Sequence, residues 1–280
     1  NRGYRLALPT TPLDGETVRA LLPPALQAAL REGECAGEVD STNARLLARP
    51  APPPGQFDFL TAEYQTAGRG RRGRSWLAPP GGAVCLSWSW SFEALSPSMG
   101  ALSLAIGVSA LRALRSVGID GVQLKWPNDL VTSEGKLGGI LIEMRTESGG
   151  PVHVVIGIGV NVALPADLQA TLAQMGTAAA DLAGLAAPAP APARADLTAA
   201  LIREGIGAVR EFAASGFAPF LDEYQAADAL RDRPVRLQGS GPVDDGVARG
   251  VDADGALRVE RQGQVHRIIA GEVSVRTAST

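Results

Sequence analysis

The residues of this chain best suited to chemistry lie in one basic, glycine-rich segment. Residues 68–76 interleave four arginines with three glycines in the order Gly-Arg-Gly-Arg-Arg-Gly-Arg-Ser-Trp. Arginine presents a fixed fork of donors to carboxylate or phosphate oxygens, and glycine lets the backbone lie close to a ligand. We therefore interpret the segment as an anion-binding flap. The alternative is a solvated, disordered basic loop, because charge runs usually face solvent.

A second group of candidates follows Trp126-Pro127. Asn128 and Asp129 come first, and Lys136 then begins the run Lys-Leu-Gly-Gly. Cationic side chains that converge on one point stabilise charge on a phosphoryl group in transfer. Asn128 or Asp129 is a candidate Mg²⁺ ligand because this cation prefers oxygen, and Trp76 is a candidate for stacking on a base. Glycines inside predicted strands indicate a ligand lying against the sheet; they are Gly138, Gly139, Gly157 and Gly159.

Hydrophobic periodicity predicts the elements that position these residues. Residues 83–92 alternate between apolar side chains and serines, which is typical of a strand with one buried face. Val39 ends another strand, and Ser41 or Asp40 suits the N-cap of the helix that follows. Other segments are predicted as helices at 26–30, 102–117 and 196–212, and as strands at 57–64, 121–125, 136–143 and 152–162.

The pattern changes near residue 232, where only short strands separated by turn residues follow. Several strands in under fifty residues predict a small SH3-like β-barrel. We therefore divide the chain into an N-terminal segment (residues 1–37), a catalytic domain (38–231) and a C-terminal domain (232–280).

Composition excludes several function classes. The chain has 280 residues and a net charge of −3, so any polyanion-binding function must be local. Cys35 and Cys85 form no CxxC pair, which favours a reducing compartment such as the cytoplasm. With only His153 and His266, a histidine-rich metal site is not available, and neither a Ser-His-Asp set nor a Walker P-loop is visible. No apolar run reaches the roughly 18 residues that cross a bilayer.

Five blocks in this order resemble the signatures of the biotin protein ligases. They are Ser-Thr-Asn at 41–43, Ala-Glu-Tyr-Gln-Thr-Ala-Gly-Arg-Gly-Arg-Arg-Gly-Arg-Ser-Trp at 62–76, Lys-Trp-Pro-Asn-Asp-Leu at 125–130, Lys-Leu-Gly-Gly-Ile-Leu at 136–141 and Gly-Ile-Gly-Val-Asn at 157–161. The C-terminal strands are similar to the small barrel of that family. The resemblance implies an α+β fold like that of the class II aminoacyl-tRNA synthetases, with a central mixed or antiparallel sheet flanked by helices.

The resemblance also implies a reaction in two steps. Biotin's carboxylate attacks the α-phosphorus of ATP, giving biotinyl-5′-AMP and pyrophosphate. A lysine amine of a biotin carboxyl carrier protein then attacks this mixed anhydride and releases AMP. The implied catalytic residues are Lys136, Arg69 and Arg71. The implied biotin-binding residues are Ser41, Thr42, Asn43, Gln65, Gly68, Arg69, Gly70, Arg71, Lys136, Gly138, Gly139 and Gly157. The implied nucleotide-binding residues are Arg71, Arg74, Trp76, Asn128 and Asn161, with Asp129 as the candidate Mg²⁺ ligand.

Two alternatives stay open at this point. A lipoate–protein ligase shares the general fold and chemistry, and a nucleic-acid-binding regulator would use the Arg/Gly loop on phosphates. The expected partner is the carrier subunit of acetyl-CoA carboxylase, and a second copy of the chain is another. Residues 1–6 look like the last strand of the N-terminal winged-helix domain that some family members carry, and DNA is expected as a partner only if such a domain exists.

Overall fold

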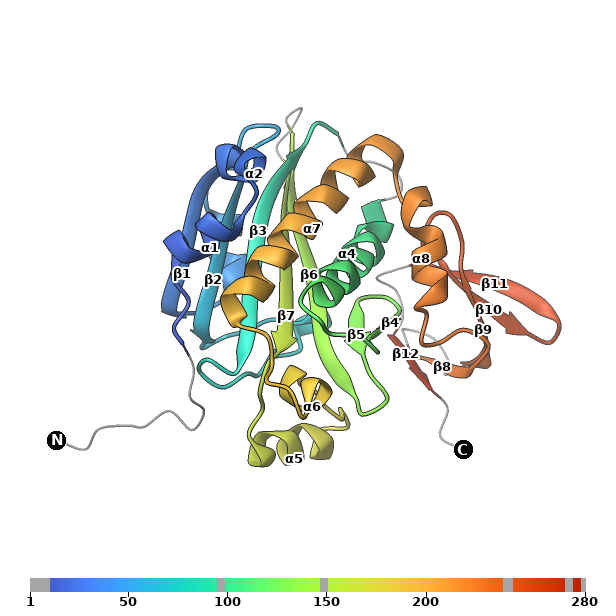
Figure 1. Cartoon of the computed structure of the whole chain (residues 1–280). Helices are drawn as coiled ribbons and strands as arrows, with labels where there is room; N and C mark the ends of the chain where they lie inside the picture. Colours follow the sequence, from blue (N-terminus) through green and yellow to red (C-terminus); the bar gives the residue numbers. More distant parts are fainter. Residues whose placement is uncertain (1–10, 95–98, 147–150, 239–243, 270–273, 278–280) are drawn as a thin grey trace.

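The centre of the molecule is a seven-stranded sheet, as a computed structural model shows (Figure 1). The structure describes residues 11–94, 99–146, 151–238, 244–269 and 274–277. The sheet strands are β1 (Leu30–Val39), β2 (Phe57–Gln65), β3 (Ala83–Phe92), β4 (Gln123–Lys125), β5 (Asp129–Val131), β6 (Lys136–Thr146) and β7 (Val152–Asn161). Their order is β1-β2-β3-β7-β6-β5-β4, with β1 parallel to β2 and the other neighbours antiparallel. The predicted mixed α+β architecture is confirmed.

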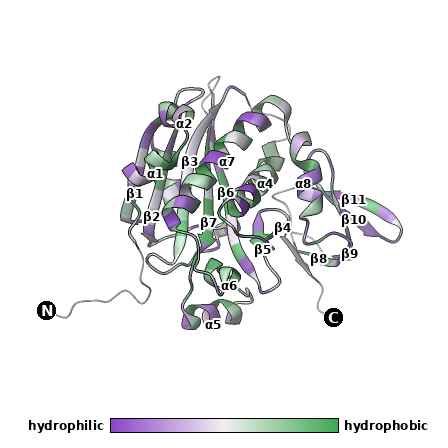
Figure 2. Ribbon diagram, viewed as in Figure 1, coloured by the Kyte–Doolittle hydropathy of each residue, from purple (hydrophilic) through white to green (hydrophobic). Residues whose placement is uncertain are grey.

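Helices cover both faces of this sheet. They are α1 (Gly15–Leu21), α2 (Pro24–Ala29), α3 (Thr42–Ala48), α4 (Leu102–Ser116), α5 (Ala166–Gln174), α6 (Leu182–Ala186), α7 (Arg194–Ser215) and α8 (Leu221–Ala226). Helices α4 and α7 lie side by side across one face, and both carry hydrophobic and hydrophilic residues (Figures 1 and 2). A Cβ at Gly205 of α7 would lie 2.6 Å from the Trp88 ring, so this helix packs directly on β3. None of the helices in the described part of the chain could span a bilayer.

Strand β3 differs from the prediction of one buried face, because every one of its residues is buried. The apolar side chains face α7, as the alternation predicts. The serines face the other side, where Ser87 Oγ lies 2.7 Å from Thr42 Oγ1 at the start of α3. The serine row suggested solvent, but Ser87 meets the polar beginning of a helix, Ser89 donates to Asp58 and Ser91 donates to the carbonyl of Pro52.

Strand β1 is the largest feature that the sequence pattern did not reveal. Only its end at Val39 was predicted, because Arg31 and the three glutamates that follow it interrupt the apolar pattern. At the edge of the sheet, only one face of a strand must be apolar, so charged residues are tolerated. The predicted division after residue 37 therefore cuts through β1, and the main sheet begins at Leu30.

The C-terminal residues form a separate five-stranded antiparallel sheet. Its strands are β8 (Pro234–Gln238), β9 (Asp244–Val251), β10 (Leu257–Arg261), β11 (Gln264–Ile268) and β12 (Ser274–Thr277), in the order β11-β10-β9-β8-β12. Trp126 Nε1 donates to the carbonyl of Gly255 at 3.2 Å, which ties this sheet to the turn before Asn128. Residues 1–6, where the strand of a winged-helix domain was expected, lie outside the described residues.

Candidate functional site

The sheet face beneath α3 carries two rows of small residues that form a floor. In strand register, Gly139 on β6 lies opposite Gly159 on β7, and Gly159 lies opposite Cys85 on β3. The next row consists of Leu141, Gly157 and Ser87. Paired residues of neighbouring strands point to the same face, so these rows lie side by side. The sequence predicted a ligand against these glycines, and in the structure protein groups lie close to them.

Protein side chains already occupy the space above two of these glycines. A Cβ at Gly157 would lie 2.2 Å from Asn43 Oδ1, and one at Gly159 would lie 2.6 Å from the Trp76 indole. Gly138 was also predicted to lie against a ligand, and here the structure differs. Its missing side chain would point at Leu130 in the core, since neighbouring residues of a strand face opposite sides. Gly138 therefore opens no space on the face that carries Gly139 and Gly157.

Polar residues at the start of α3 form a connected network. Ser41 is the N-cap, as predicted, and accepts from Ala44 N at 3.4 Å. Thr42 N donates to Gln65 Oε1 at 2.8 Å. Asn43 Oδ1 accepts from Ser87 Oγ at 2.6 Å. Four of the residues expected to bind biotin, Ser41, Thr42, Asn43 and Gln65, therefore lie together around the start of α3. Asn43 is buried and its amide is used inside the protein.

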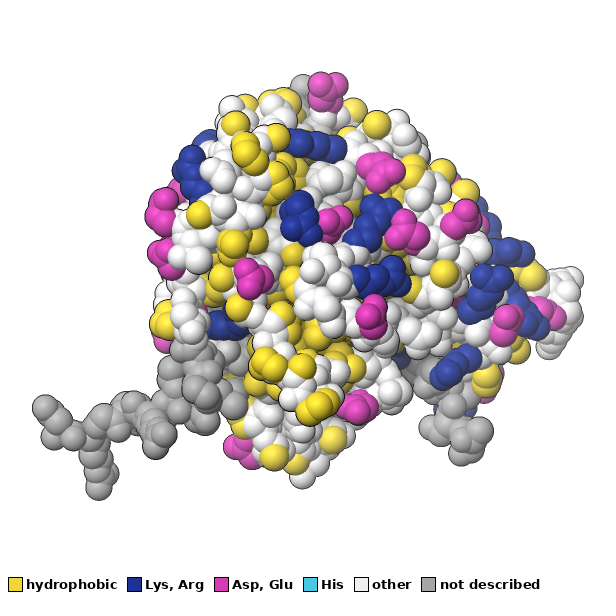
Figure 3. Space-filling view, in the orientation of Figure 1, with side chains coloured by type: hydrophobic (Ala, Val, Ile, Leu, Met, Phe, Trp, Pro, Cys, Tyr) yellow, Lys and Arg dark blue, Asp and Glu magenta, His cyan; other side chains and the backbone are white. Residues whose placement is uncertain are grey.

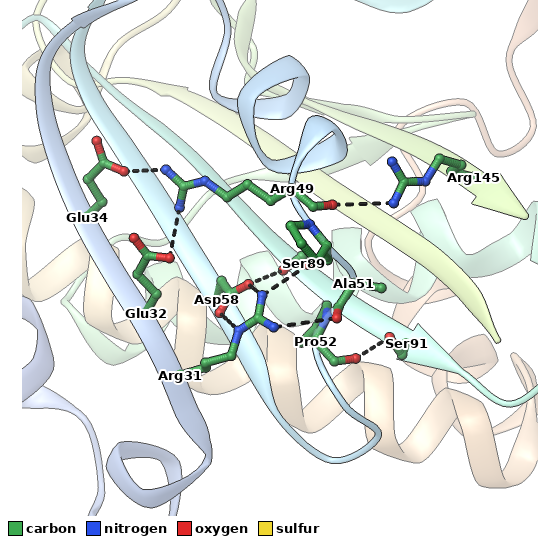
Figure 4. Close-up of polar contacts among 11 residues, drawn as sticks. Arg31, Glu32, Glu34, Arg49, Ala51, Pro52, Asp58, Ser89, Ser91 and Arg145 are labelled. Carbon is green, nitrogen blue, oxygen red and sulfur yellow. Dashed lines mark hydrogen bonds and ion pairs between the residues drawn. The ribbon is translucent and has the colours of Figure 1, made fainter. Parts of the chain in front are cut away.

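The other end of α3 is fixed by Arg145 of β6 and by the pairing of its C-cap residue, Arg49, with β1 (Figure 4). Arg145 of β6 donates to the carbonyls of Leu47 and Arg49 at 3.1 and 3.4 Å. Arg49 in turn pairs with Glu34 of β1. Cationic groups at a helix C-terminus satisfy its last carbonyls and stabilise it. These contacts set the position from which the first turn of α3 reaches the floor.

A buried ion pair secures β1 beside the same helix. Arg31 Nε donates to Asp58 Oδ1 at 2.8 Å, and Ser89 Oγ donates to Asp58 Oδ2 at 3.3 Å (Figure 4). Arg31 also donates to the carbonyl of Pro50, in the loop that leaves α3. The pair therefore joins the edge strand, the sheet interior and the proline-rich loop.

Lys136 reaches the floor because the strand register shifts next to it. Leu130 pairs with Gly138, yet the next residue, Val131, pairs with Lys136. Such a bulge re-aims a side chain. A Cβ at Gly139 would lie 3.3 Å from Lys136 Nζ, and this ammonium is 2.6 Å from Asp129 Oδ1. The lysine predicted to contact phosphate therefore points to the glycine row.

The backbone of Lys136 is held by the segment that follows α5. Lys136 N donates to the carbonyl of Ala178 at 2.8 Å, and Ala180 N donates to the carbonyl of Lys136 at 2.9 Å. Asn161 Nδ2 donates to the carbonyls of Lys136 and Ala180. Asn128 Nδ2 similarly donates to the carbonyl of Ile140 at 2.8 Å. Both asparagines thus hold β6 in place.

The glycine-arginine segment folds as a short hairpin over this region. Trp76 N donates to the carbonyl of Gly68 at 2.9 Å, and Gly70 N donates to the carbonyl of Arg74 at 2.7 Å. Arg69 Nη1 lies 3.3 Å from Glu143 Oε1, and the Arg74 side chain is exposed. The segment therefore has internal order.

Arg71 is the most buried arginine of this hairpin. Burial lowers the pKa of its guanidinium below its ordinary value, the neighbouring Arg72 acts in the same direction, and the charge of Asp129 opposes both. Asp129 is in direct contact with Lys136, at 2.6 Å. The charge of this one carboxylate therefore acts on two cations, Lys136 and Arg71.

The described residues do not form a protein-only metal site. No group of three or more His, Cys, Asp or Glu side chains is suitably placed among them. Asp129 is a single carboxylate, and one of its oxygens is held by Lys136. A resident metal therefore does not fit this donor set, and no chemical step is assigned to one.

The two thiols should be unreactive in the folded protein. Burial raises the pKa of Cys85 to about 11 and that of Cys35 to about 12, with neighbouring carboxylates adding to the effect at Cys35. Thiols protonated at pH 8 are poor nucleophiles. We expect slow alkylation by iodoacetamide in the native state and rapid modification of both thiols in denaturant, read by mass; rapid native labelling would contradict this burial.

Sequence reasoning missed two residues of the site, Ser87 and Glu143. Ser87 belonged to a serine row assigned to an exposed face, and Glu143 was taken only as the end of a strand. A carboxylate on an otherwise apolar strand was the available signal, because a charged group in such a place usually has a partner.

Comparisons with known proteins match both parts of the chain. Residues 38–161 match the Biotin/lipoate A/B protein ligase family, and residues 232–276 match the Biotin protein ligase C terminal domain. The chain is 36% identical over 277 residues to the bifunctional ligase/repressor BirA of Escherichia coli strain K12, covering 99% of this chain and 82% of that protein. It is 33% identical over 281 residues to a biotin–[acetyl-CoA-carboxylase] ligase of Mycobacterium tuberculosis, covering 94% and 95%.

The fold also matches solved structures. The biotin protein ligase from Aquifex aeolicus in complex with biotin and ATP is similar with a TM-score of 0.73 and 25% identity. The similarity covers 89% of this chain and 100% of that one.

Proposed function

The chain belongs to the biotin protein ligase family, and from this premise we propose how its residues divide the work of an ATP-dependent biotin–protein ligase. Biotin and ATP are its substrates. The carboxylate of biotin displaces pyrophosphate from the α-phosphorus of ATP, and a lysine amine then displaces AMP from the mixed anhydride. The first step needs no general base, because the carboxylate is already ionised; it needs alignment and charge neutralisation.

The start of α3 is the proposed site of the ureido head. Ser41, Thr42 and Gln65 supply hydroxyl, backbone and amide groups there, and Asn43 fixes their arrangement through Ser87. A ligand without ureido groups would leave buried polar atoms unpaired, which gives discrimination. The glycines of the hairpin and floor (Gly68, Gly70, Gly139 and Gly157) let the backbone and Asn43 pack closely.

Lys136, Arg69 and Arg71 are the proposed catalytic cations. Lys136 Nζ lies 2.6 Å from Asp129 Oδ1, next to Gly139, and the charge of Asp129 also acts on the partly buried Arg71 guanidinium, so the charges of two cations converge on this carboxylate. This convergence is the single observation that carries the proposal. A negatively charged α-phosphate placed there would be stabilised as charge develops in transfer. The hairpin above it would exclude water from the adenylate.

The nucleotide side is proposed to include Arg71, Arg74, Trp76, Asn128 and Asn161. Asn128 and Asn161 act through the backbone of β6 that they hold. Mg²⁺ is proposed to arrive with the ATP phosphates, for which one carboxylate such as Asp129 is enough. The proposed acceptor is the carrier subunit of acetyl-CoA carboxylase, with the reaction in the cytoplasm.

Trp76 offers a direct signal of ligand binding. It is only partly buried, whereas Trp88, Trp90 and Trp126 are buried. We propose that its indole packs against the bound adenylate. Adding biotin and ATP should therefore change the intrinsic fluorescence, and Trp76→Phe should remove most of that change. An equal change in the variant would place the reporting tryptophan elsewhere.

Two further partners are open proposals. β1 is an edge strand, and such a strand is where a second copy of the chain would pair. DNA is proposed only together with an N-terminal winged-helix domain. On the face that Figure 3 shows, basic and acidic side chains are intermixed, which does not favour binding of a polyanion there.

The proposed function is tested by transfer to an acceptor. The chain is incubated with ATP, Mg²⁺, biotin and a biotin carboxyl carrier domain, and the intact mass of the domain is measured. We expect one added biotinyl group at one lysine, dependent on ATP. An unmodified carrier domain, or a domain modified with lipoate in place of biotin, would refute the proposal.

A further inference from the structure

Glu143 joins the two parts of the site. Its carboxylate comes from β6, on the face that α3 covers, opposite Val155. Oε2 accepts from Asn43 Nδ2 at 2.9 Å, and Oε1 lies 3.3 Å from Arg69 Nη1. One side chain therefore contacts both the first turn of α3 and the glycine-arginine hairpin. Glu143 is not among the residues expected to bind biotin or ATP.

The contact with Asn43 fixes the orientation of a buried amide. Asn43 is 3% exposed, and the second hydrogen of its Nδ2 goes to the carbonyl of Leu141 at 3.2 Å. Both amide hydrogens thus donate to β6, so Oδ1 must face Ser87. Ser87 also contacts Thr42, whose backbone is bonded to Gln65. A continuous hydrogen-bonded chain runs from Glu143 to the proposed ureido site.

The contact with Arg69 is of a different kind. The side chains of Arg69 and Glu143 are 51% and 24% exposed, so solvent screens the pair and it contributes little to stability. A weak contact suits an arginine that must leave its partner when an anionic ligand arrives. The buried contact to Asn43 has the larger effect, because losing it leaves an amide N–H without an acceptor.

We propose that Glu143 is a positioning residue of this site, with one oxygen orienting Asn43 and the other holding Arg69 until ligand binds. The inference rests on the proposed function for its ligand. It adds a physical link between the pocket floor and the hairpin. Ligand binding at the floor therefore affects the hairpin, and binding at the hairpin affects the floor, through the Glu143 carboxylate.

Two substitutions separate the roles of the two oxygens. Glu143→Gln keeps an oxygen acceptor for Asn43 but removes the charge that faces Arg69, and Glu143→Leu removes both. By calorimetry without ATP, we expect Glu143→Leu to weaken biotin binding by about tenfold. Glu143→Gln should stay within about threefold of the unmodified chain. Glu16→Gln on α1 removes an exposed carboxylate far from the site and serves as the matched control.

A second readout follows the hairpin itself. Limited trypsin digestion of the ligand-free protein, read by mass, reports cleavage after the arginines of residues 69–74. Both Glu143 variants should be cleaved there up to about fivefold faster, the size of effect expected from an exposed ion pair. Biotin with ATP should restore slow cleavage in Glu143→Gln. Thermal unfolding of each variant confirms that it is folded.

Three results would overturn the inference. They are unchanged biotin affinity in a folded Glu143→Leu, an equal loss in Glu143→Gln, and hairpin cleavage rates identical to those of Glu16→Gln. If the unmodified chain itself binds no biotin, the proposed function fails. The cleavage rates of the ligand-free variants still decide whether Glu143 holds Arg69.

Discussion

Replacing Lys136 with alanine should lower the rate of adenylate formation by about a hundredfold to a thousandfold, the usual effect of removing one preorganised group that stabilises transition-state charge. The ammonium lies beside Asp129 and Gly139, where the proposed α-phosphate would sit. Because its backbone is fixed by Ala178 and Ala180, the loss should appear in kcat with little change in biotin affinity. Single-turnover formation of biotinyl-5′-AMP, followed by chromatography, measures it.

The matched control is Arg258→Ala, which removes an exposed cation from β10 in the C-terminal sheet. Its adenylation rate should equal that of the unmodified chain. Lys136→Arg keeps the charge but changes the geometry, so it should recover only part of the activity. Unchanged adenylation in Lys136→Ala would remove this lysine from the chemistry.

Replacing Arg31 with alanine should destabilise the fold by about 3–5 kcal/mol, because it leaves the Asp58 carboxylate buried without its ion-pair partner. Asp58 is 1% exposed, and within the described part of the chain it would keep the hydrogen bond from Ser89 alone. Arg31 is 33% exposed, so most of the cost comes from the stranded carboxylate and not from the lost arginine side chain. Urea unfolding at constant pH measures the free energy of unfolding.

The double variant Arg31→Ala/Asp58→Asn tests the cause. It removes the buried charge as well, so most of the lost stability should return. If the double variant is no more stable than Arg31→Ala, packing of the arginine side chain is responsible instead of the stranded charge.

Much of the architecture was predictable from local patterns. The hydrophobic pattern predicted strands β3 and β7, and the cap residue Ser41 predicted the start of α3. Turn residues separated the predicted strands after residue 232. These signals are local, because each depends on the period of one element or on one capping side chain. They hold wherever tertiary packing agrees with the local preference.

The missed features depend on contacts between distant residues. β1 exists because β2 lies beside it, although its own sequence is charged. Glu143 meets Asn43 across 100 positions of sequence, and no local period encodes that contact. The serines of β3 suggested a solvent face, but α3, Asp58 of β2 and the proline-rich loop cover them. Gly138 and Gly139 looked equivalent in sequence, and strand alternation makes them face opposite sides.

Biotin-dependent exchange of labelled pyrophosphate into ATP tests most directly whether this site joins biotin to AMP. It needs no acceptor protein, so it isolates the step assigned to Lys136, Arg69 and Arg71. We predict rapid exchange with biotin and none above background with lipoate or without ligand. Exchange supported by lipoate but not by biotin, or no exchange with either, would contradict the assignment.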